Sequence, residues 1–254
     1  MNPERLVCGI HAVNAALTRD GHVAELWVDS GRRNDARLRS LIDVATTQVI
    51  PLHFVALAEV DRLATNLRHQ GVVGRINSAP VYSEHDLERL IEQHGKTLLL
   101  LVLDGVQDPH NLGACLRTAD AAGVHAVIAP RDRATGLTAA VRKVACGGAE
   151  SVPFIQVTNL ARTLRYCKDK GVWLVGASGE ADMEVYEADL QGPIGLVLGA
   201  EESGLRRLTK EHCDSLVRIP MLGQVESLNV SVATGICLYE VLRQRQVAGG
   251  DRKK

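Results

Sequence analysis

The spacing of apolar residues changes along the chain and divides it into three segments. In the first, residues 1–76, short apolar groups alternate with polar residues. Their periods predict helices over 11–17 and 38–49 and a strand over 23–28.

The second segment, residues 77–96, differs from both neighbours in composition. It carries Asn77, Ser78 and Pro80, two basic and four acidic residues, and no strong apolar period. We therefore expect a linker with a short surface helix between two domains, residues 1–76 and 97–254.

The third segment alternates apolar runs with helical stretches. The apolar runs are sized for buried strands and lie at 98–103, 124–129, 152–157, 172–177, 194–198 and 216–219. The helical stretches lie at 112–122, 137–146, 160–168 and 228–245. This alternation predicts an α/β fold with a mainly parallel sheet that is covered on both faces. Because ligands of such sheets bind at the carboxyl ends of the strands, we expect chemistry in the loops after residues 103, 198 and 219.

Composition restricts the class of protein. With 254 residues, 46% apolar and 23% charged, the chain has the values of a globular protein. No apolar run approaches the ~18–20 residues of a membrane span, and the N-terminus lacks the pattern of a secretory signal. Six scattered cysteines without a C-x-x-C predict reduced thiols in a cytoplasmic protein. No histidine stands at metal-ligand spacing from another histidine or cysteine, so we expect no metal.

The net charge of −1 gives no sign of a nucleic-acid partner. The basic residues are 22 Arg and 7 Lys, and the planar guanidinium suits phosphate, although genome composition is the simpler source of this excess. Four arginines stand within eight residues after Gly31: Arg32, Arg33, Arg37 and Arg39. They fit either a solvated helix start or an RNA-binding patch.

The loop after residue 103 leads into the first candidate motif. Asn111 stands where we expect a helix N-cap. Arg117 lies about 140° from Leu112 around the helix, so it points away from the apolar face and can meet an anion. Gly113 would let another backbone or a ligand come close. Taken singly, Asn111 is more simply a cap and Arg117 a solvated residue.

The second loop has the pattern Gly199-x-Glu201-x-x-Gly204 directly after an apolar strand. Its placement is that of a dinucleotide fingerprint, but Glu201 replaces the middle glycine. Because a carboxylate would repel pyrophosphate, the loop suits a ligand that is neutral or cationic overall. A turn with a cap is the alternative.

The third loop places small polar residues at the start of a predicted helix. Ser227, Asn229 and Ser231 accompany free N–H groups there, and both can hydrogen-bond a ligand. Capping alone explains any one of these residues. Three such loops at three strand ends of one sheet argue together for a single site.

Together the loops resemble the signature motifs of the SpoU/TrmH family of RNA ribose 2′-O-methyltransferases. The matching residues are Asn111-x-Gly113-x-x-x-Arg117, Gly199-x-Glu201-x-x-Gly204 and Ile219-Pro220-Met221-x-Gly223-x-x-x-Ser227-Leu228-Asn229-Val230-Ser231. Their order, spacing and placement agree across about residues 97–247, and residues 143–149 are similar to the family's segment between the first two motifs.

The first segment extends this resemblance. Residues 8–17 and 69–73 are similar to the small α/β substrate-binding domain, L30e/L7Ae-like, of one subgroup. That subgroup methylates the ribose of a guanosine in the peptidyl-transfer P-loop of bacterial 23S ribosomal RNA. Related tRNA and ribosomal enzymes share this layout, so assignment to the subgroup rests on less specific sequence than assignment to the family.

The resemblance implies a catalytic domain with a deep C-terminal trefoil knot (SPOUT-like), S-adenosylmethionine as methyl donor and a homodimer. The loops from Gly199 and over 219–228 would form the knot. Backbone groups of Gly199, Ile219 and Leu228 would bind the adenosine part of the donor.

The resemblance also implies roles for the polar motif residues. The family's proposal lets Arg117 activate the ribose 2′-hydroxyl. Because the pKa of arginine exceeds about 12, we expect it instead to clamp a neighbouring phosphate, while that phosphate or a water accepts the proton. Glu201, Ser227 and Asn229 would shape the donor loop and the target pocket, and Asn111 would position the hydroxyl or the phosphate. The candidates for RNA contact in the small domain are Arg32, Arg33, Arg37, Arg39 and Arg75.

Three alternatives remain. The same chemistry could act on a tRNA ribose, or the fold could serve a noncatalytic RNA-binding assembly factor. A nucleotide-dependent oxidoreductase is disfavoured, because the chain has no G-x-G-x-x-G.

Overall fold

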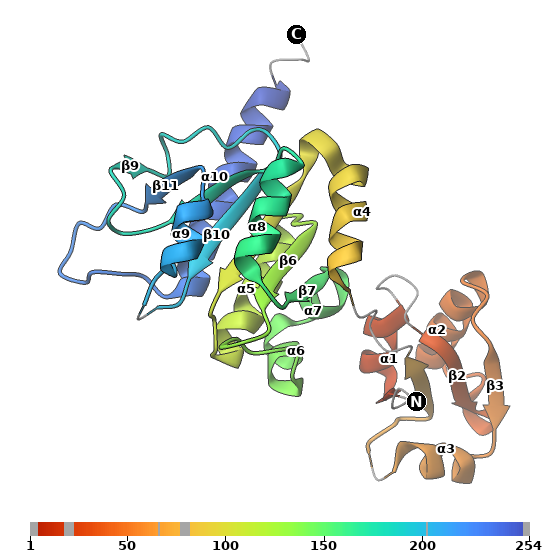
Figure 1. Ribbon diagram of the computed structural model, residues 1–254. Helices are drawn as coiled ribbons and strands as arrows, with labels where there is room; N and C mark the ends of the chain where they lie inside the picture. The colour runs from red at the N-terminus through yellow and green to blue at the C-terminus, as the bar shows by residue number, and fades with distance from the viewer. Residues whose placement is uncertain (1–4, 18–22, 66, 77–81, 202, 251–254) are drawn as a thin grey trace. The chain divides into compact units, whose positions relative to one another are not determined.

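The computed structural model describes residues 5–17, 23–65, 67–76, 82–201 and 203–250. The chain forms two compact units, Met1–Val81 and Tyr82–Lys254 (Figure 1). Residues 1–4, on which the expected absence of a secretory signal partly rests, and residues 77–81 of the expected linker lie outside the described residues.

The first unit holds a four-stranded mixed sheet. In chain order its elements are β1 Arg5–Cys8, α1 Ile10–Leu17, β2 Val23–Asp29, the 3₁₀ turn η1 Ser30–Arg32, α2 Ala36–Thr47, β3 Leu52–Val55, α3 Leu57–Ala64 and β4 Val72–Ile76. The strand order is β1-β4-β2-β3, with β2 and β3 parallel and the β4 ladders antiparallel. Leu26 packs on one face with α1 and α2, and Val73 packs on the other with α3.

The second unit holds a seven-stranded sheet in which every ladder is parallel. The strands are β5 Leu99–Asp104, β6 Ala126–Pro130, β7 Phe154–Val157, β8 Trp173–Ala177, β9 Met183–Glu184, β10 Ile194–Gly199 and β11 Ser215–Arg218. Their order is β7-β6-β5-β10-β8-β11-β9. The predicted α/β fold with a mainly parallel sheet is confirmed.

Helices cover both faces of this sheet (Figure 1). They are α4 Glu84–His94, the 3₁₀ turn η2 Gly95–Thr97, α5 Pro109–Ala121, α6 Ala139–Ala145, α7 Gly148–Ser151, α8 Leu160–Asp169, α9 Arg207–His212 and α10 Val230–Gly250. Alternate residues of β5 face opposite layers: Leu101 packs with residues of α5 and α10, and Leu100 packs with residues of α4 and α8. All six residues of β5 are therefore buried.

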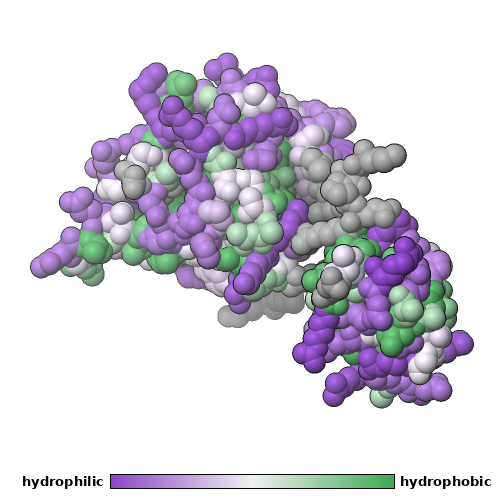
Figure 2. Space-filling view, turned by 90° about the horizontal axis from the view of Figure 1, so that it is seen from below, coloured by the Kyte–Doolittle hydropathy of each residue, from purple (hydrophilic) through white to green (hydrophobic). Residues whose placement is uncertain are grey.

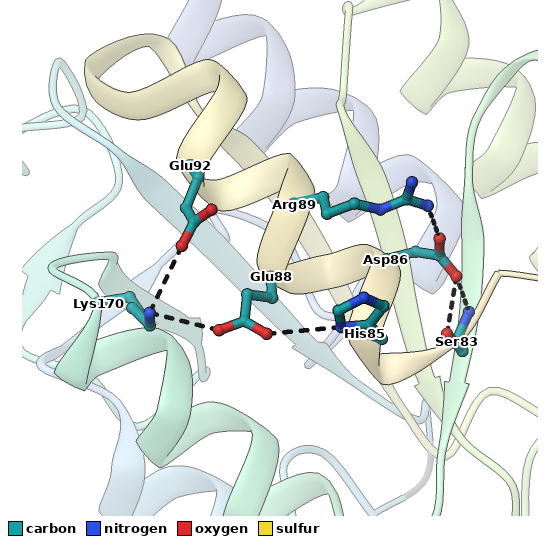
Figure 3. Close-up of polar contacts among 7 residues, drawn as sticks. All are labelled: Ser83, His85, Asp86, Glu88, Arg89, Glu92 and Lys170. Carbon is teal, nitrogen blue, oxygen red and sulfur yellow. Dashed lines mark hydrogen bonds and ion pairs between the residues drawn. The ribbon is translucent and has the colours of Figure 1, made fainter.

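Helix α4 belongs to the second unit, although it lies within the expected linker. Its Leu87 and Ile91 are buried in the core that α8 also covers. Ser83 and Asp86 form a capping box at its start, and Lys170 lies 3.5 Å from Glu88 across to α8 (Figure 3). The expected surface helix is present, but from Tyr82 onward the segment is packed structure, because Leu87, Leu90 and Ile91 share one helix face.

Candidate active site

The loop after β10 folds back on its own strand. A Cβ at Gly199 would lie 2.0 Å from the backbone carbon of Gly204, so only glycine fits. Gly204 has φ +61°, and its N–H donates to the carbonyl of Ala200 at 2.8 Å. The two glycines of the second motif therefore serve a tight reversal of the backbone. This turn leaves the Glu201 side chain exposed next to the other two motif loops.

A buried carboxylate holds the far end of this turn. The Asp104 side chain, at the end of β5, is fully buried. Its Oδ2 accepts the backbone N–H of Arg206 at 3.0 Å, and its Oδ1 lies 3.2 Å from Arg206 Nε. Sequence reasoning missed this pair, for which an acidic residue ending an otherwise apolar run was the available signal.

The first motif begins differently from our prediction. Helix α5 is capped by Asp108, whose Oδ1 accepts the N–H of His110 at 3.0 Å, with Pro109 in its first turn. The expectation that Asn111 is the N-cap was therefore wrong. The favoured Asp-Pro start places the cap three residues earlier. Asn111 lies inside the first turn of α5, and its side chain is available for contacts with other loops.

Side chains from the three motifs meet at Glu201. Its Oε1 accepts hydrogen bonds from Asn111 Nδ2 at 3.1 Å, from Asn229 Nδ2 and from the backbone N–H of Val230 at 3.3 Å. Asn229 Nδ2 also donates to Asn111 Oδ1 at 2.9 Å. We name Asn111, Glu201 and Asn229 the Asn–Glu–Asn cluster. It joins the first turn of α5 to the loops after β10 and β11 at the carboxyl edge of the sheet.

Asn229 has a second task at the start of α10. Its Oδ1 accepts the backbone N–H of Ser231 at 2.9 Å and the hydroxyl of Ser231 at 2.5 Å. This is the hydrogen bond of a helix N-cap. Asn229 is therefore both a helix cap and a site residue. Its Oδ1 caps α10, and its Nδ2 donates to the other two residues of the cluster.

A cavity of ≈ 370 Å³ lies beside this cluster. Its walls include all three residues that we expected to bind the donor, Gly199, Ile219 and Leu228, together with Ser227 and Glu201. The walls combine apolar side chains, such as those of Leu198 and Val217, with backbone groups of the folded turn. Glu180 and Glu226 also line it, together with Lys210, whose Nζ lies 2.5 Å from a carboxylate oxygen of Glu180.

Arg117 lies on the exposed side of α5, as its spacing predicted, and is not among the residues that line the cavity. Its Nη1 donates to Cys146 Sγ at 3.6 Å. Helices α5, α6 and α7 pack closely around this point, because Gly113 contacts Val144 and Gly148 contacts Leu116 without room for a Cβ. The close approach expected at Gly113 is thus that of a neighbouring helix.

The candidate RNA contacts of the first unit differ in their surroundings. Arg32 donates to the carbonyl of Gln70 at 2.6 Å and to Asp35 at 2.5 Å, so it holds two loops together. Arg33 lies over the Phe54 ring at 4.5 Å.

Arg75 pairs with Glu25 across two strands. Arg37 and Arg39 are exposed and form no ion pair within the described residues. Arg32 and Arg37 line an open hollow of ≈ 770 Å³. Arg32 and Arg75 therefore hold parts of the fold together, whereas Arg37 and Arg39 face solvent.

No group of three or more His, Cys, Asp or Glu among the described residues is placed to hold a metal ion. None of the described helices is long and apolar enough to cross a membrane. On the face seen in Figure 2 the second unit is largely hydrophilic, with small hydrophobic groups between.

The carboxylate at the turn after β10 would repel a pyrophosphate and favours a cationic ligand. The sulfonium donor of a methyltransferase is such a ligand. The chain is of that enzyme class. It belongs to the SpoU rRNA Methylase family, whose profile matches residues 98–239. The profile of the RNA 2′-O ribose methyltransferase substrate-binding domain matches residues 6–82.

Individual proteins agree with the family. The 23S rRNA (guanosine-2′-O-)-methyltransferase RlmB of Shewanella oneidensis is 54% identical over 97% of this chain and 100% of its own length. The SpoU methyltransferase AviRb of Streptomyces viridochromogenes, solved with AdoMet, has a TM-score of 0.72 at 26% identity, covering 96% of this chain and 91% of its own. A TrmH/SpoU tRNA modifying enzyme of A. aeolicus has a TM-score of 0.55 at 35% identity, covering 65% of this chain and 85% of its own.

Proposed function

We propose that this chain transfers a methyl group from S-adenosylmethionine to the ribose 2′-hydroxyl of a guanosine in 23S ribosomal RNA, in the peptidyl-transfer P-loop. The observation that carries the proposal is the Asn–Glu–Asn cluster, because it unites all three family motifs beside one cavity. The near full-length similarity to a 23S rRNA guanosine methyltransferase supports the substrate.

The cavity residues fit the donor. Apolar walls at Leu198 and Ile219 suit an adenine ring, and the backbone around Gly199 has polar groups without side chains in the way. Lys210, which also lines the cavity, pairs with Glu180, and the remaining carboxylates of Glu201 and Glu226 favour a ligand with positive charge. When bound, S-adenosylmethionine supplies an electrophilic methyl group. Gly199, Ile219 and Leu228 would hold its adenosine part through their backbone groups.

The remaining motif residues would orient the RNA. Arg117 would clamp a phosphate next to the target ribose with its fork of N–H donors, and that phosphate or a water would take the proton of the 2′-hydroxyl. Asn111 would position the hydroxyl or the phosphate. Glu201, Ser227 and Asn229 would shape the donor loop and the target pocket. Alignment of the nucleophile with the methyl group is the main contribution to the rate in this scheme.

We further propose three features of the assembly. The loops from Gly199 and over 219–228 form a trefoil knot, and the first unit is an L30e/L7Ae-like domain that contacts RNA through its arginines. The enzyme works as a homodimer. Exposed apolar side chains support a partner surface, since Tyr239 and Val232 on α10 are 53% and 50% exposed. Such an enzyme would act in the cytoplasm, where ribosomal RNA is found.

The alternatives are the same chemistry on a tRNA ribose and a noncatalytic assembly factor. The tRNA-modifying relative covers only 65% of this chain, whereas the 23S rRNA methyltransferase covers 97%, first unit included. The complete set of motif residues disfavours a noncatalytic role.

One experiment tests the function. Purified protein is incubated with labelled S-adenosylmethionine and with protein-free 23S RNA or total tRNA, and the 2′-O-methyl positions are mapped. We expect one methylated guanosine in the P-loop of the 23S RNA and none in tRNA. Methylation of tRNA alone supports the first alternative, and donor binding without transfer supports the second.

A further inference from the structure

The arginines of the second unit fall into two groups. Most of those described form an ion pair with a carboxylate, as Arg142 does with Glu150 at 2.8 Å. Arg245 donates to backbone carbonyls instead. Within the described residues a further four have neither a carboxylate partner nor such a set of carbonyl contacts: Arg117, Arg131, Arg133 and Arg165.

Two of these four lie in one loop at the carboxyl edge of the sheet. Residues 131–138 connect β6 to α6, and both Arg131 and Arg133 are exposed. The only hydrogen bond of the Arg131 side chain within the described residues is a long one, 3.5 Å, from Nε to the carbonyl of Gln156. Asp132 stands between them in the sequence, and no ion pair joins it to either arginine among the described residues.

This loop is fastened to the active site. The N–H of Thr135 donates to the carbonyl of Val106, in the loop after β5, at 3.0 Å. Arg206, which Asp104 holds at the end of the second motif, donates from Nη2 to the carbonyl of Asp132 at 3.4 Å. The loop therefore borders two motif loops directly.

The loop is also linked to Arg117 through α6. It leads into the N-terminus of α6, and Cys146, which contacts Arg117, follows the C-terminus of that helix. A helix of seven residues is about 10 Å long, so a few nucleotides of one strand can span this distance.

The backbone at Arg133 is strained. Its φ of +55° lies in the left-handed region, which is unfavourable for any residue with a Cβ, and glycine would relieve it. An arginine at this position keeps a cation in place at some cost to stability.

We propose that Arg131 and Arg133 form a phosphate-binding site that holds the RNA strand next to the target nucleotide. The inference rests on the proposed function and adds a contact on the catalytic unit itself. The site binds the sugar-phosphate backbone, because it consists of guanidinium groups and the loop has no aromatic side chain on which a base could stack. Together with Arg117 it would guide one strand along α6 towards the cavity.

The test compares the Arg131→Gln/Arg133→Gln double variant with wild type in methyl transfer to protein-free 23S RNA. We expect KM for RNA to rise about tenfold, with kcat within twofold, because the contacts hold the strand and take no part in the reaction. The slope of log kcat/KM against log salt concentration should become shallower by roughly 1.4, or about 0.7 per lost phosphate contact. The Kd for S-adenosylmethionine should not change.

Two further variants complete the design. Arg165→Gln removes an exposed, unpaired arginine in the middle of α8 and should leave KM and slope as in wild type. Arg133→Gly suits the φ of +55° and should weaken RNA binding without lowering Tm. The inference is overturned if the double variant keeps the wild-type KM and slope, or if Arg165→Gln changes them equally. If the wild-type protein transfers no methyl group, the proposed function fails. The phosphate site is then tested by the affinity for 23S RNA, whose dependence on salt should still be shallower in the double variant than in wild type.

Discussion

Asp104 binds Arg206 at two points, through the backbone N–H and through the guanidinium, and so ties the end of β5 to the end of the second motif. Residues 102 positions apart in the chain thereby fix the turn that presents Glu201. The carboxylate is fully buried and the guanidinium is partly exposed. Loss of the Asp104 carboxylate should therefore lower stability more than loss of the arginine side chain.

We expect Asp104→Asn to lower the free energy of unfolding by about 2–3 kcal/mol, since it removes the charge from a fully buried acceptor and turns one of its two acceptor atoms into a donor that faces the N–H groups of Arg206. Chemical denaturation measures this. The control is Arg207→Ala, which removes an exposed ion pair with Glu211 and should change stability by less than about 0.5 kcal/mol. Equal effects of the two substitutions on the free energy of unfolding would show that the buried pair contributes no more to stability than the exposed one.

Gly199→Ala should destabilise the protein by at least ~2 kcal/mol, because the new Cβ would collide with the backbone of Gly204 and force the turn apart. Binding of S-adenosylmethionine, followed by calorimetry, should be lost together with the turn. Gly192→Ala is the matched control, because a Cβ there meets nothing within 4 Å. A Gly199→Ala protein with normal donor affinity would contradict the role of this turn.

The two tasks of Asn229 can be separated by substitution. Asn229→Ala removes both the cap of α10 and the amide of the Asn–Glu–Asn cluster, and we expect a loss of about 1 kcal/mol in stability and at least about tenfold in kcat/KM. Asn229→Ser keeps a capping oxygen and should recover most of the stability but not the activity. Recovery of activity by serine would show that only the cap matters.

The cysteines should react unequally with iodoacetamide at pH 8. Burial raises the pKa of Cys115 to about 11 and those of Cys167 and Cys237 to about 12, whereas the thiol of Cys146 is exposed. We expect Cys146 to be modified first, as mass spectrometry of peptides will show. Because its sulfur contacts Arg117, modification should lower methyl transfer, and Cys146→Ser should protect the enzyme. Labelled protein with full activity would argue against this contact.

The capping box of α4 should give a measurable pH dependence. Hydrogen bonds from the backbone and side chain of Ser83, and then from Arg89, lower the pKa of Asp86 from 3.8 to about 2 (Figure 3). The folded pKa lies below the unfolded one, so the stabilisation is complete above about pH 4 and is lost as the pH falls through 2. Asp86→Asn should cost about 1 kcal/mol at pH 6, after allowance for solvent screening, and progressively less towards pH 2. A constant difference over this range would contradict the assignment.

Much of the second unit could be predicted from the sequence, because its buried strands are continuous apolar runs separated by helical periods. The observed β10 and β8 lie within one residue of the expected bounds. The short elements β9, α7 and α9 were missed, since a few residues carry no period. Strand order was beyond reach as well, because nothing local in the sequence tells β10 to insert between β5 and β8.

The candidate site was predictable as a set of loops but not as a set of contacts. The spacing of Arg117 gave its exposure correctly, because helix geometry fixes direction. The cap at Asp108 and the clasp of Asp104 on Arg206 escaped prediction, because each depends on where a chain turn begins or on a partner far away in the sequence. The roles of the motif residues in catalysis stay predictions.

The place of β10 in the middle of the sheet has a consequence during synthesis. Strand β5 pairs with β10 along its whole length, from Leu99 opposite Ile194 to Asp104 opposite Gly199. A ribosome that adds about 5–20 residues per second needs roughly 4–18 s to translate the intervening 105–193. Throughout that interval one edge of β5 has no neighbour. Nascent chains of this enzyme should therefore be sensitive to aggregation and to chaperone supply in a way that the finished molecule is not.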